Sequence, residues 1–405
     1  MTELQKQWYE QGENYAKAVN EMVAYANQYG WDNYKDKEPE DNRGHLAPAV
    51  FDALKKANLE NKVSEFRNQF PPAHIPFISM FEEKSQAIRL INIIDEKRAV
   101  FFAGGAWEEY QVYLIDEHKI IELDNQITAI GKAKNGTIFA IAFDDKIIIK
   151  EHWDGDVIKT VARKITADFH ITNLIPFNNG EKVLLISPNG IYLISENEEK
   201  LLKYGLSDDR GYGELSMEHG ALSHDNCYIA VGDQNSNHAI LDNNGELITD
   251  FYPMSSYPHF CEFSKDDTQL IVNSCHFYNG VTNSIDMQNF KTLDEEEDLP
   301  IIDDGMRVYE GVAVEDYYIL GDAYGYIRAV DKTGKELWQH YLGSTISGMA
   351  ISDDNKTLWV GAYSGFLHKL SLNTPYRDTH TIGTGDLFEE FRLIIWKGEE
   401  QIWWW

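Results

Sequence analysis

The sequence has few cysteines and no long apolar run. Its three cysteines, Cys227, Cys261 and Cys275, are too few and too scattered for a disulfide framework or a CxxC-type metal site. No apolar run reaches the roughly 18 residues that a membrane span needs, and residues 1–10 lack the apolar core of a signal peptide. These absences predict a soluble, cytoplasmic protein.

Basic side chains are scarce relative to acidic ones. The 36 Lys and Arg residues are set against 66 Asp and Glu residues, so the net charge is −30. Such a charge repels phosphate backbones and anionic membranes and attracts basic surfaces. We therefore expect a basic protein partner and no nucleic-acid or membrane partner. The alternative is that acidic loops only keep a large protein soluble.

Catalytic and metal-binding motifs are also absent. The sequence has no Gly-rich phosphate loop, HExxH motif or EF-hand loop, and its 13 histidines lack metal-like pairing. Ser223, His224 and Asp225 are triad residue types, but their adjacency in a turn splays the side chains apart. Cys275 and His276 are neighbours on an expected strand and therefore point to opposite faces. We expect no catalytic residue, no metal and no cofactor, and thus a protein that is not an enzyme.

Residues 1–72 have helical periodicity. Apolar side chains recur at three- and four-residue spacing after Thr2, a candidate N-cap, and Gly30 is placed to end this helix. Pro48 opens a second helical pattern that runs towards Phe66, and a proline pair closes the segment. We expect the apolar stripe to pack on the side or central opening of the following domain. The alternative is a separate partner-binding helix.

From residue 89 onwards the pattern changes to short strands that repeat. Each repeat reads apolar strand, polar turn and apolar strand, which makes a hairpin, with two further short strands around it. A period of roughly 40 to 50 residues with four strands is typical of a propeller blade. The seven copies predict an all-β, seven-bladed β-propeller over residues 73–405, behind a helical N-terminal segment over residues 1–72. The copies begin at Ile94, Ala133, Phe177, Ser223, Ser264, Ala313 and Ser352.

One blade resembles known propeller families. Residues 325–338, Gly-Tyr-Ile-Arg-Ala-Val-Asp-Lys-Thr-Gly-Lys-Glu-Leu-Trp, are similar to one repeat of the quinoprotein-like (pyrroloquinoline-quinone-type) and WD-repeat propellers, with their strand, Asp-x-x-Gly turn and closing Trp. The resemblance implies the propeller fold over residues 89–382. It implies no quinone cofactor, because the vicinal cysteine pair and the calcium site of the quinoprotein dehydrogenases are missing.

The C-terminal residues follow the seventh repeat, which we expect to end near Gly383. Residues 391–396 and 401–405 have the pattern of a short hairpin. We expect it to pack against an extended stretch at residues 75–81. Burial of the three terminal tryptophans is favoured over a binding patch, because their exposure would promote aggregation. The tail is similar to tails of bacterial propeller proteins encoded beside polymorphic toxin genes, which implies an immunity protein.

The remaining functional candidate is a loop surface. In a blade, the loop between the second and third strands lies on the same face as the connection to the next blade. Aromatic anchors among carboxylates on this face suit an interface for a basic protein. The predicted partner-binding residues are Trp107, Asp208, Asp209, Tyr212, Tyr257, Tyr278, Asp294, Glu295, Glu296, Glu297, Asp298, Asp303, Asp304, Tyr324 and Tyr363, and the same loops contain Asp144, Asp145, His238 and Tyr252.

These residues predict a non-catalytic binding protein, most concretely an immunity protein that neutralises a basic bacterial toxin. Two alternatives remain open at this point. The loop face is an ordinary solvated surface, or the protein is a quinoprotein- or lactonase-like enzyme with its site in the propeller channel.

Overall fold

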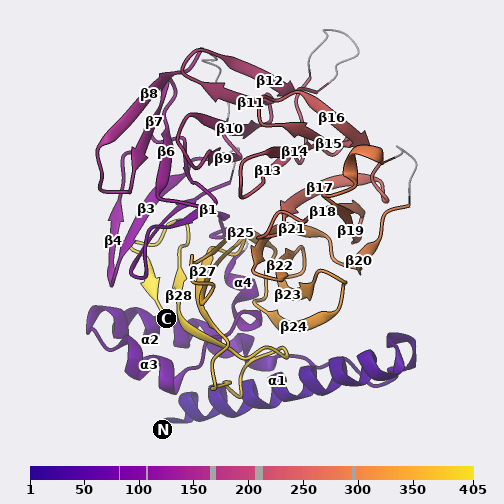
Figure 1. The fold of residues 1–405 in the computed structure, drawn as a ribbon. Helices are drawn as coiled ribbons and strands as arrows, with labels where there is room; N and C mark the ends of the chain where they lie inside the picture. Colours follow the sequence, from indigo (N-terminus) through magenta and orange to yellow (C-terminus); the bar gives the residue numbers. More distant parts are fainter. Residues whose placement is uncertain (82, 106–107, 165–169, 206–212, 294–297) are drawn as a thin grey trace.

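The protein is a seven-bladed β-propeller with a helical segment along one side (Figure 1). The computed structural model describes residues 1–405 except 82, 106–107, 165–169, 206–212 and 294–297. Each blade is an antiparallel sheet in which successive strands of the sequence pair with one another. The first strands of adjacent blades lie side by side around the centre. The predicted fold class and blade count are therefore confirmed.

The strands are short and follow one another without crossovers. Blades 1 to 3 comprise β1 (Ile88–Ile93), β2 (Arg98–Ala103), β3 (Gln111–Asp116) and β4 (Lys119–Glu122); β5 (Ala129–Lys132), β6 (Ile138–Ala142), β7 (Lys146–Glu151) and β8 (Val157–Ala162); and β9 (Asn173–Pro176), β10 (Lys182–Ser187), β11 (Gly190–Ser195) and β12 (Glu199–Lys203). Blades 4 and 5 comprise β13 (His219–Leu222), β14 (Tyr228–Gly232), β15 (His238–Asp242) and β16 (Leu247–Phe251); and β17 (Tyr257–Phe263), β18 (Gln269–His276), β19 (Asn279–Asp286) and β20 (Ile301–Asp304). Blades 6 and 7 comprise β21 (Val308–Val314), β22 (Tyr317–Asp322), β23 (Tyr326–Asp331) and β24 (Glu336–Tyr341); and β25 (Ile346–Ile351), β26 (Thr357–Ala362), β27 (Phe366–Leu372), β28 (Leu387–Ile394) and β29 (Trp403–Trp404).

The repeated sequence block forms the turn between the first and second strands of a blade. In blade 4 the Ser223 hydroxyl donates to Asp225 Oδ1 at 2.7 Å and accepts from the Tyr228 backbone N–H at 2.9 Å. Asn226 takes a left-handed φ of 58° in this turn, which Asn tolerates better than most residues. The Ser–Asp bond recurs at the equivalent turns of blades 5 and 7. This local chemistry explains why the repeat was readable in the sequence.

The ring closes by packing between blade 1 and blade 7, without a shared strand. β1 lies beside β25, and the Ser347 hydroxyl donates to the Ile88 carbonyl oxygen at 2.8 Å. Gly361 is needed at this seam because a Cβ there would lie 2.1 Å from the Ile88 carbonyl oxygen. Each seam buries a cluster of aliphatic and aromatic side chains from two neighbouring sheets, and this burial supplies most of the stabilisation.

The C-terminal residues belong to blade 7, which corrects the prediction of a separate hairpin after Gly383. β28 is the fourth strand of blade 7, and β29 pairs with β28 as a fifth strand. The prediction failed because a long connection of residues 373–386 precedes the fourth strand, and this hid the strand from the repeat pattern. Burial of the tail is confirmed for Trp403 and Trp405, whereas Trp404 is half-buried.

The helical segment extends beyond residue 72, and residues 1–81 form four α-helices and three 3-10 helices. α1 (Glu3–Tyr29) begins at a Thr2 capping box and ends at Gly30, as the sequence predicted. The second helical pattern is broken into α2 (Ala47–Leu59) and α3 (Val63–Gln69), because Asn61 takes a left-handed φ of 56° between them. The 3-10 helices of this segment are η1 (Trp31–Asn33), η2 (Asn42–Leu46) and η3 (Ile75–Phe77). The short helix α4 (Ile78–Phe81) follows η3 directly. Another 3-10 helix, η4 (Phe290–Thr292), lies in blade 5.

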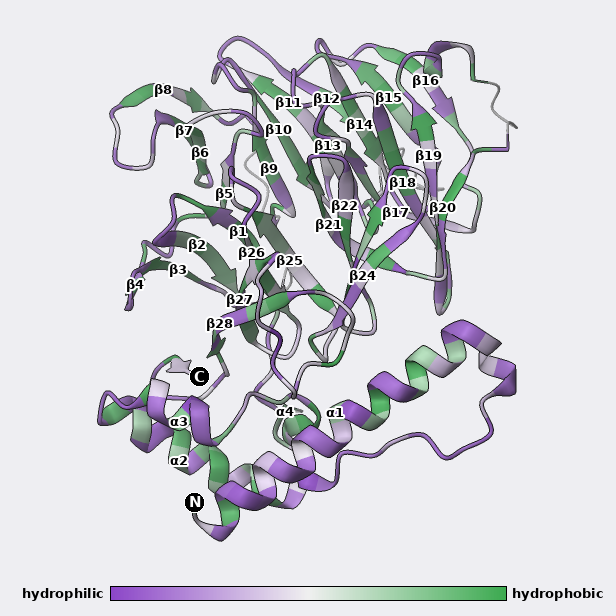
Figure 2. Ribbon diagram, turned by 60° about the horizontal axis from the view of Figure 1, so that its bottom comes forward, coloured by the Kyte–Doolittle hydropathy of each residue, from purple (hydrophilic) through white to green (hydrophobic). Residues whose placement is uncertain are grey.

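The helices pack on the side of the ring, at blade 7 (Figure 2). Trp8 and Phe77 surround Trp405, with ring centroids 6.2 and 5.3 Å from it. The stretch at residues 75–81 therefore packs with the tail as predicted, but it is helical instead of extended. The segment Ile75-Pro76-Phe77 turns sharply so that Phe77 reaches the aromatic cluster. No described helix is both long and apolar enough to cross a membrane.

Candidate partner-binding surface

The two ends of the ring carry different turns. The turns between second and third strands and the connections between blades share one end, which we call the upper face. In blade 5, for example, His276 pairs with Asn279 at the β18–β19 turn, and Asp304 at the end of β20 pairs with the nearby Val281. The turns built on the Ser–Asp bond lie at the opposite end, which we call the lower face. This confirms the geometric premise of the predicted surface.

Four exposed aromatic side chains lie on the upper face over blades 5, 6 and 7. We call Phe277, Tyr278, Tyr324 and Tyr363 the aromatic rim; their exposed fractions are 63, 77, 50 and 47%. The Tyr324 hydroxyl donates to the Tyr278 carbonyl oxygen at 3.2 Å, which joins blades 5 and 6. Tyr252, 52% exposed, lies on the connection that leads into blade 5. Large apolar side chains this exposed and this close together are typical of interaction sites.

Hydrogen bonds hold the turns of the aromatic rim. Asp322 Oδ1 accepts from the backbone N–H groups of Tyr324 and Tyr326, both at 2.8 Å. Thr345 then links two turns, since its hydroxyl donates to the Ala323 carbonyl oxygen and its own carbonyl oxygen accepts from the Tyr363 N–H. In blade 5, Arg307 Nη1 donates to the Phe277 carbonyl oxygen at 2.8 Å. The aromatic rim is therefore preorganised, which reduces the entropy lost on binding.

The described residues predicted for the upper face differ in their exposure. Asp304 is exposed there, as are Asp144 and Asp145 at the β6–β7 turn. Asp303 is buried, because its carboxylate accepts from Arg328 Nη1 at 2.7 Å and from the Met306 N–H at 2.9 Å. It therefore offers no contact to a partner. Tyr257 is half-buried in β17, and His238 is buried at the start of β15.

Asp298 lies in the connection from β19 to β20, at the lower face, which corrects its grouping with the aromatic residues. β19 ends there at Asp286, which pairs with Gln269 next to the Asp266 turn. Asp298 is exposed, whereas Asp294, Glu295, Glu296 and Glu297 lie outside the described residues. The strand β20 is only four residues long, so the sequence pattern did not reveal it or the connection that precedes it. The face at which Asp298 lies was therefore not predicted. Trp107, Asp208, Asp209 and Tyr212 also lie outside the described residues.

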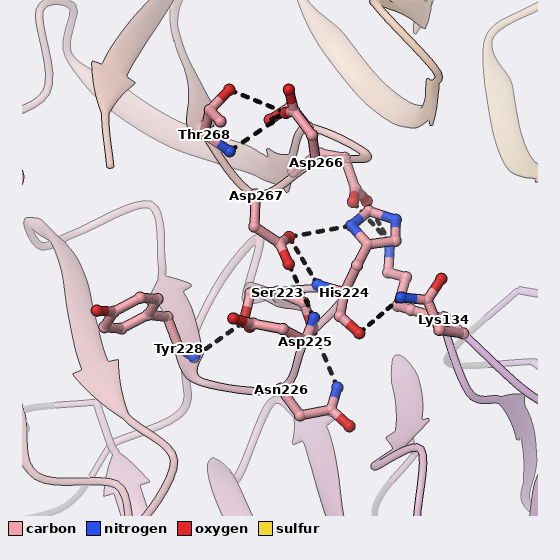
Figure 3. A network of polar contacts seen from close by, with 12 residues as sticks. Lys134, Ser223, His224, Asp225, Asn226, Tyr228, Asp266, Asp267 and Thr268 are labelled. Atoms are coloured by element: carbon pink, nitrogen blue, oxygen red, sulfur yellow. Dashed lines mark hydrogen bonds and ion pairs between the residues drawn. The ribbon is translucent and has the colours of Figure 1, made fainter. Parts of the chain in front are cut away.

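Lower-face carboxylates link neighbouring blades (Figure 3). Asp267 accepts from the backbone N–H groups of His224 and Asp225 at 2.7 and 2.8 Å, which joins blade 5 to blade 4. The His224 ring, buried, lies with Nδ1 3.2 Å from the same carboxylate, while Ser223 bonds Asp225. Ser223, His224 and Asp225 thus form turn contacts, and no relay runs from the serine to the histidine.

A cysteine–histidine pair lies below the upper face, and sequence reasoning missed it. His259 Nε2 is in contact with Cys275 Sγ, whereas the expected neighbour, His276, contacts Ser256 at 3.2 Å. The pair arises because a bulge between Pro258 and Phe260 shifts the β17–β18 register by one residue. Without the bulge, Cys275 would pair with Pro258, and its side chain would lie on the opposite face of the sheet from His259. With the bulge, Cys275 pairs with Tyr257, and its side chain lies on the same face as His259.

The chemistry of this pair is that of two neutral groups. Burial raises the pKa of the Cys275 thiol. Burial, together with the nearby Arg307 charge, lowers the pKa of His259 to about 4. A thiolate is the reactive form of cysteine and needs a lowered pKa, so the pair as it stands is not an activated nucleophile. Among the described residues there is no group of three or more His, Cys, Asp or Glu side chains placed to hold a metal ion.

Comparisons with known proteins find solved structures of similar fold but no family to which the chain belongs. No family model matches the chain, and no curated protein matches it in sequence. Among solved structures it is similar to the computationally designed Ika8 protein, with 15% identity over 71% of this chain and 97% of that one, at a TM-score of 0.45. It is also similar to the β-propeller domain of Cps50 (Swd1) from Myceliophteria thermophila, with 12% identity over 71% and 93% of the two chains, at a TM-score of 0.47. A third likeness is to hydrazine synthase from Kuenenia stuttgartiensis, with 12% identity over 61% and 76%, at a TM-score of 0.45.

Proposed function

We propose that the chain is a non-catalytic binding protein whose upper face captures a basic protein. The observation that carries the proposal is the aromatic rim of Phe277, Tyr278, Tyr324 and Tyr363, exposed on hydrogen-bonded turns of three adjacent blades. Tyr is enriched among residues that dominate binding energy because it brings a large apolar area and a polar tip with little rotamer entropy. A propeller fold is consistent with such a role.

The charge of the chain supports a basic partner. With a net charge of −30, the protein attracts cationic surfaces from a distance and repels polyanions. Exposed carboxylates on the upper face include Asp144, Asp145 and Asp304. Such charges govern association rate and partner choice, whereas buried aromatic contacts govern dissociation.

The most concrete form of the proposal is an immunity protein that neutralises a bacterial toxin. A toxin that acts on a polyanion presents a basic site, and a rigid acidic platform is able to cover that site without a catalytic residue of its own. The resemblance of the C-terminal tail to propellers encoded beside polymorphic toxin genes is the support for this partner.

The experiment uses the product of the adjacent gene as the candidate toxin. Binding is measured with purified proteins, and protection is measured as growth on co-expression. We expect Tyr278→Ala with Tyr324→Ala to weaken binding at least about tenfold and to lose protection. Tyr29→Ala is the matched control, since Tyr29 is 53% exposed at the far end of α1. Unchanged affinity in the double variant would refute the upper face as the site.

A further inference from the structure

A groove of about 470 Å³ lies between blades 3 and 4, towards the outer side of the ring (Figure 1). The outermost strand of blade 3, β12, forms one wall, and β14, β15 and β16 of blade 4 form the other. The volume is in the range of small-molecule sites, about 300 to 1,000 Å³. The aromatic rim lies on blades 5, 6 and 7, so the groove is a separate candidate site.

The strand register of blade 4 leaves room for the groove. Val231 pairs with Ala239, and Ala239 pairs with Asp250, so the three side chains form one row on the same face of the sheet. The alanine in the middle of this row has only a methyl group, which leaves space between its neighbours. Leu241 pairs with Leu247 on the same face and continues the wall as apolar surface.

The apolar surface of the groove is accessible. Leu201 on β12 and Leu247 on β16 line it, with exposed fractions of 38 and 62%. Leu202 and Ala239 also line it and are half-buried. An apolar group that enters the groove therefore removes exposed apolar surface from water, which favours binding.

Polar contacts hold both ends of the groove. At the lower end, Lys200 Nζ donates to the Asn244 carbonyl oxygen at 2.9 Å, which joins blade 3 to blade 4. At the upper end, Lys203 Nζ lies 3.6 Å from Asp233 Oδ1, which joins the same two blades. The groove is therefore preformed, and this reduces the entropy lost on binding.

The charges at the upper end do not balance. Lys203 and Asp250 both line the groove, and Asp233 lies beside Lys203. Burial lowers the pKa of the Lys203 ammonium group, and the charges of Asp233 and Asp250 act against this lowering. Two carboxylates thus act on one ammonium group, and the net charge of this end is negative.

Asp250 retains the capacity to accept hydrogen bonds. Its Oδ2 accepts from Asn237 Nδ2 at 3.2 Å, and no described basic residue forms an ion pair with it. A carboxylate offers about four lone-pair sites, and this one is only half-buried. A wholly apolar ligand would cover the carboxylate without replacing its water, which is unfavourable. The groove therefore favours a ligand that combines an apolar body with a cationic hydrogen-bond donor.

We propose that this groove binds a small amphipathic amine, that is, an apolar chain or ring system with a terminal ammonium group. The ammonium group donates to Asp250, and the apolar body packs along Leu201, Ala239 and Leu247. The net charge of the protein, −30, attracts such a ligand and repels a carboxylate of equal size. The site does not depend on whether the upper face binds a protein.

The test compares three ligands with the same chain and different head groups: octylamine, octanol and octanoate. Binding to the full chain is measured by ligand-observed NMR and calorimetry at physiological ionic strength, where non-specific attraction to the acidic surface is screened. We expect octylamine to bind at one saturable site at millimolar concentration or below, octanol to bind more weakly, and octanoate not to bind. Butylamine should bind at least about tenfold more weakly than octylamine, because it buries less apolar surface.

Two variants locate the site. Asp250→Asn removes the charge and keeps the shape of the side chain, and we expect it to weaken octylamine binding at least about tenfold and to leave octanol binding unchanged. Leu247→Ser removes an exposed apolar side chain, and we expect it to weaken both ligands several-fold. The matched controls are Asp316→Asn, exposed in the β21–β22 turn, and Leu337→Ser, 45% exposed on β24. Both should bind octylamine like the wild type.

Three results would overturn the proposal. The first is that octylamine shows no saturable binding. The second is that octanoate binds as tightly as octylamine, because the head group is then not recognised by Asp250. The third is that the Asp250 and Leu247 variants both bind octylamine like the wild type, or that the Asp316 change weakens binding as much as the Asp250 change, since binding then follows only the total charge.

Discussion

Lys134 in blade 2 reaches Glu262 in blade 5, with its Nζ 2.6 Å from one carboxylate oxygen and 2.7 Å from the other. Two blades lie between them along the ring, so this ion pair spans the lower mouth of the central channel. Glu262 is buried, and its charge contributes, after burial, to raising the pKa of Glu310 to about 8. Lys134 therefore neutralises the negative charge of Glu262, which acts on the buried carboxyl group of Glu310.

The first prediction concerns this pair. Lys134→Met leaves Glu262 buried without its counter-ion, and we expect a loss of about 2 kcal/mol in the free energy of unfolding, measured by urea titration. Adding Glu262→Gln to that variant should recover most of the loss, because no unpaired charge remains. Asp353→Ala is the control: it breaks the Lys132–Asp353 pair, whose carboxylate is 80% exposed, and should have little effect. Equal losses in the Lys134 and Asp353 variants would contradict the argument.

The second prediction concerns the C-terminal tryptophan. Trp405 is fully buried, and its Nε1 donates to the Phe70 carbonyl oxygen at 2.8 Å. We expect Trp405→Ala to lower the free energy of unfolding by about 3 to 5 kcal/mol, since it leaves a cavity between the helices and blade 7. Deletion of residues 391–405 should be more damaging still, because it removes β29 and the second half of β28 from blade 7. Trp31→Ala, at an exposed position, is the control; similar melting temperatures for Trp31 and Trp405 variants would argue against tail burial.

The third prediction concerns pH. Burial lowers the pKa of His219, His259, His340 and His368 to about 4 each, against about 6.5 in an unfolded chain. The unfolded state therefore binds more protons between pH 4 and 6.5, so this stability is present above pH 6.5 and is lost on acidification. Each such histidine contributes about 1.4 kcal/mol per pH unit in that window.

Glu310 acts in the opposite direction. With its pKa raised to about 8, its contribution is present at acid pH and is lost as the pH rises through 8. Since four histidines oppose one glutamate, we expect the free energy of unfolding to fall from pH 6.5 to pH 5, measured by urea titration at fixed salt. His340→Leu should make this decline shallower by one histidine's share. A stability that is flat or rising over this interval would show that these histidines are not buried and neutral.

The fourth prediction separates the two faces of the propeller in binding a basic partner. If the upper face binds, Tyr278→Ala should mainly speed dissociation, and Asp304→Asn should mainly slow association. Added salt should slow association by the wild type, since the screening length is about 8 Å at physiological ionic strength. Asp298→Asn tests the lower face in the same kinetic binding measurements. A slower association in that variant, with none in Asp304→Asn, would move the interface to the lower face.

Parts of the fold that depend on local chemistry were readable in the sequence. The Ser–Asp turn of Ser264 and Asp266 is made by residues two positions apart, so its pattern survives in the sequence of each strong repeat. The same holds for the Thr2 capping box of α1. The number of blades follows from counting such local units, because each blade is one short meander that repeats.

The sequence by itself determined the propeller, its seven blades, its acidic charge and the burial of Trp403 and Trp405, because periodicity and composition act within one blade. Only the tertiary structure decided which side chains share a face or a cavity. A bulge between Pro258 and Phe260 brings Cys275 to His259, the ring brings Lys134 to Glu262, and the packing of α1 on blade 7 encloses His74 and His340. Such contacts join residues tens to hundreds of positions apart, and a shift of one residue in strand register reverses the face of every following side chain.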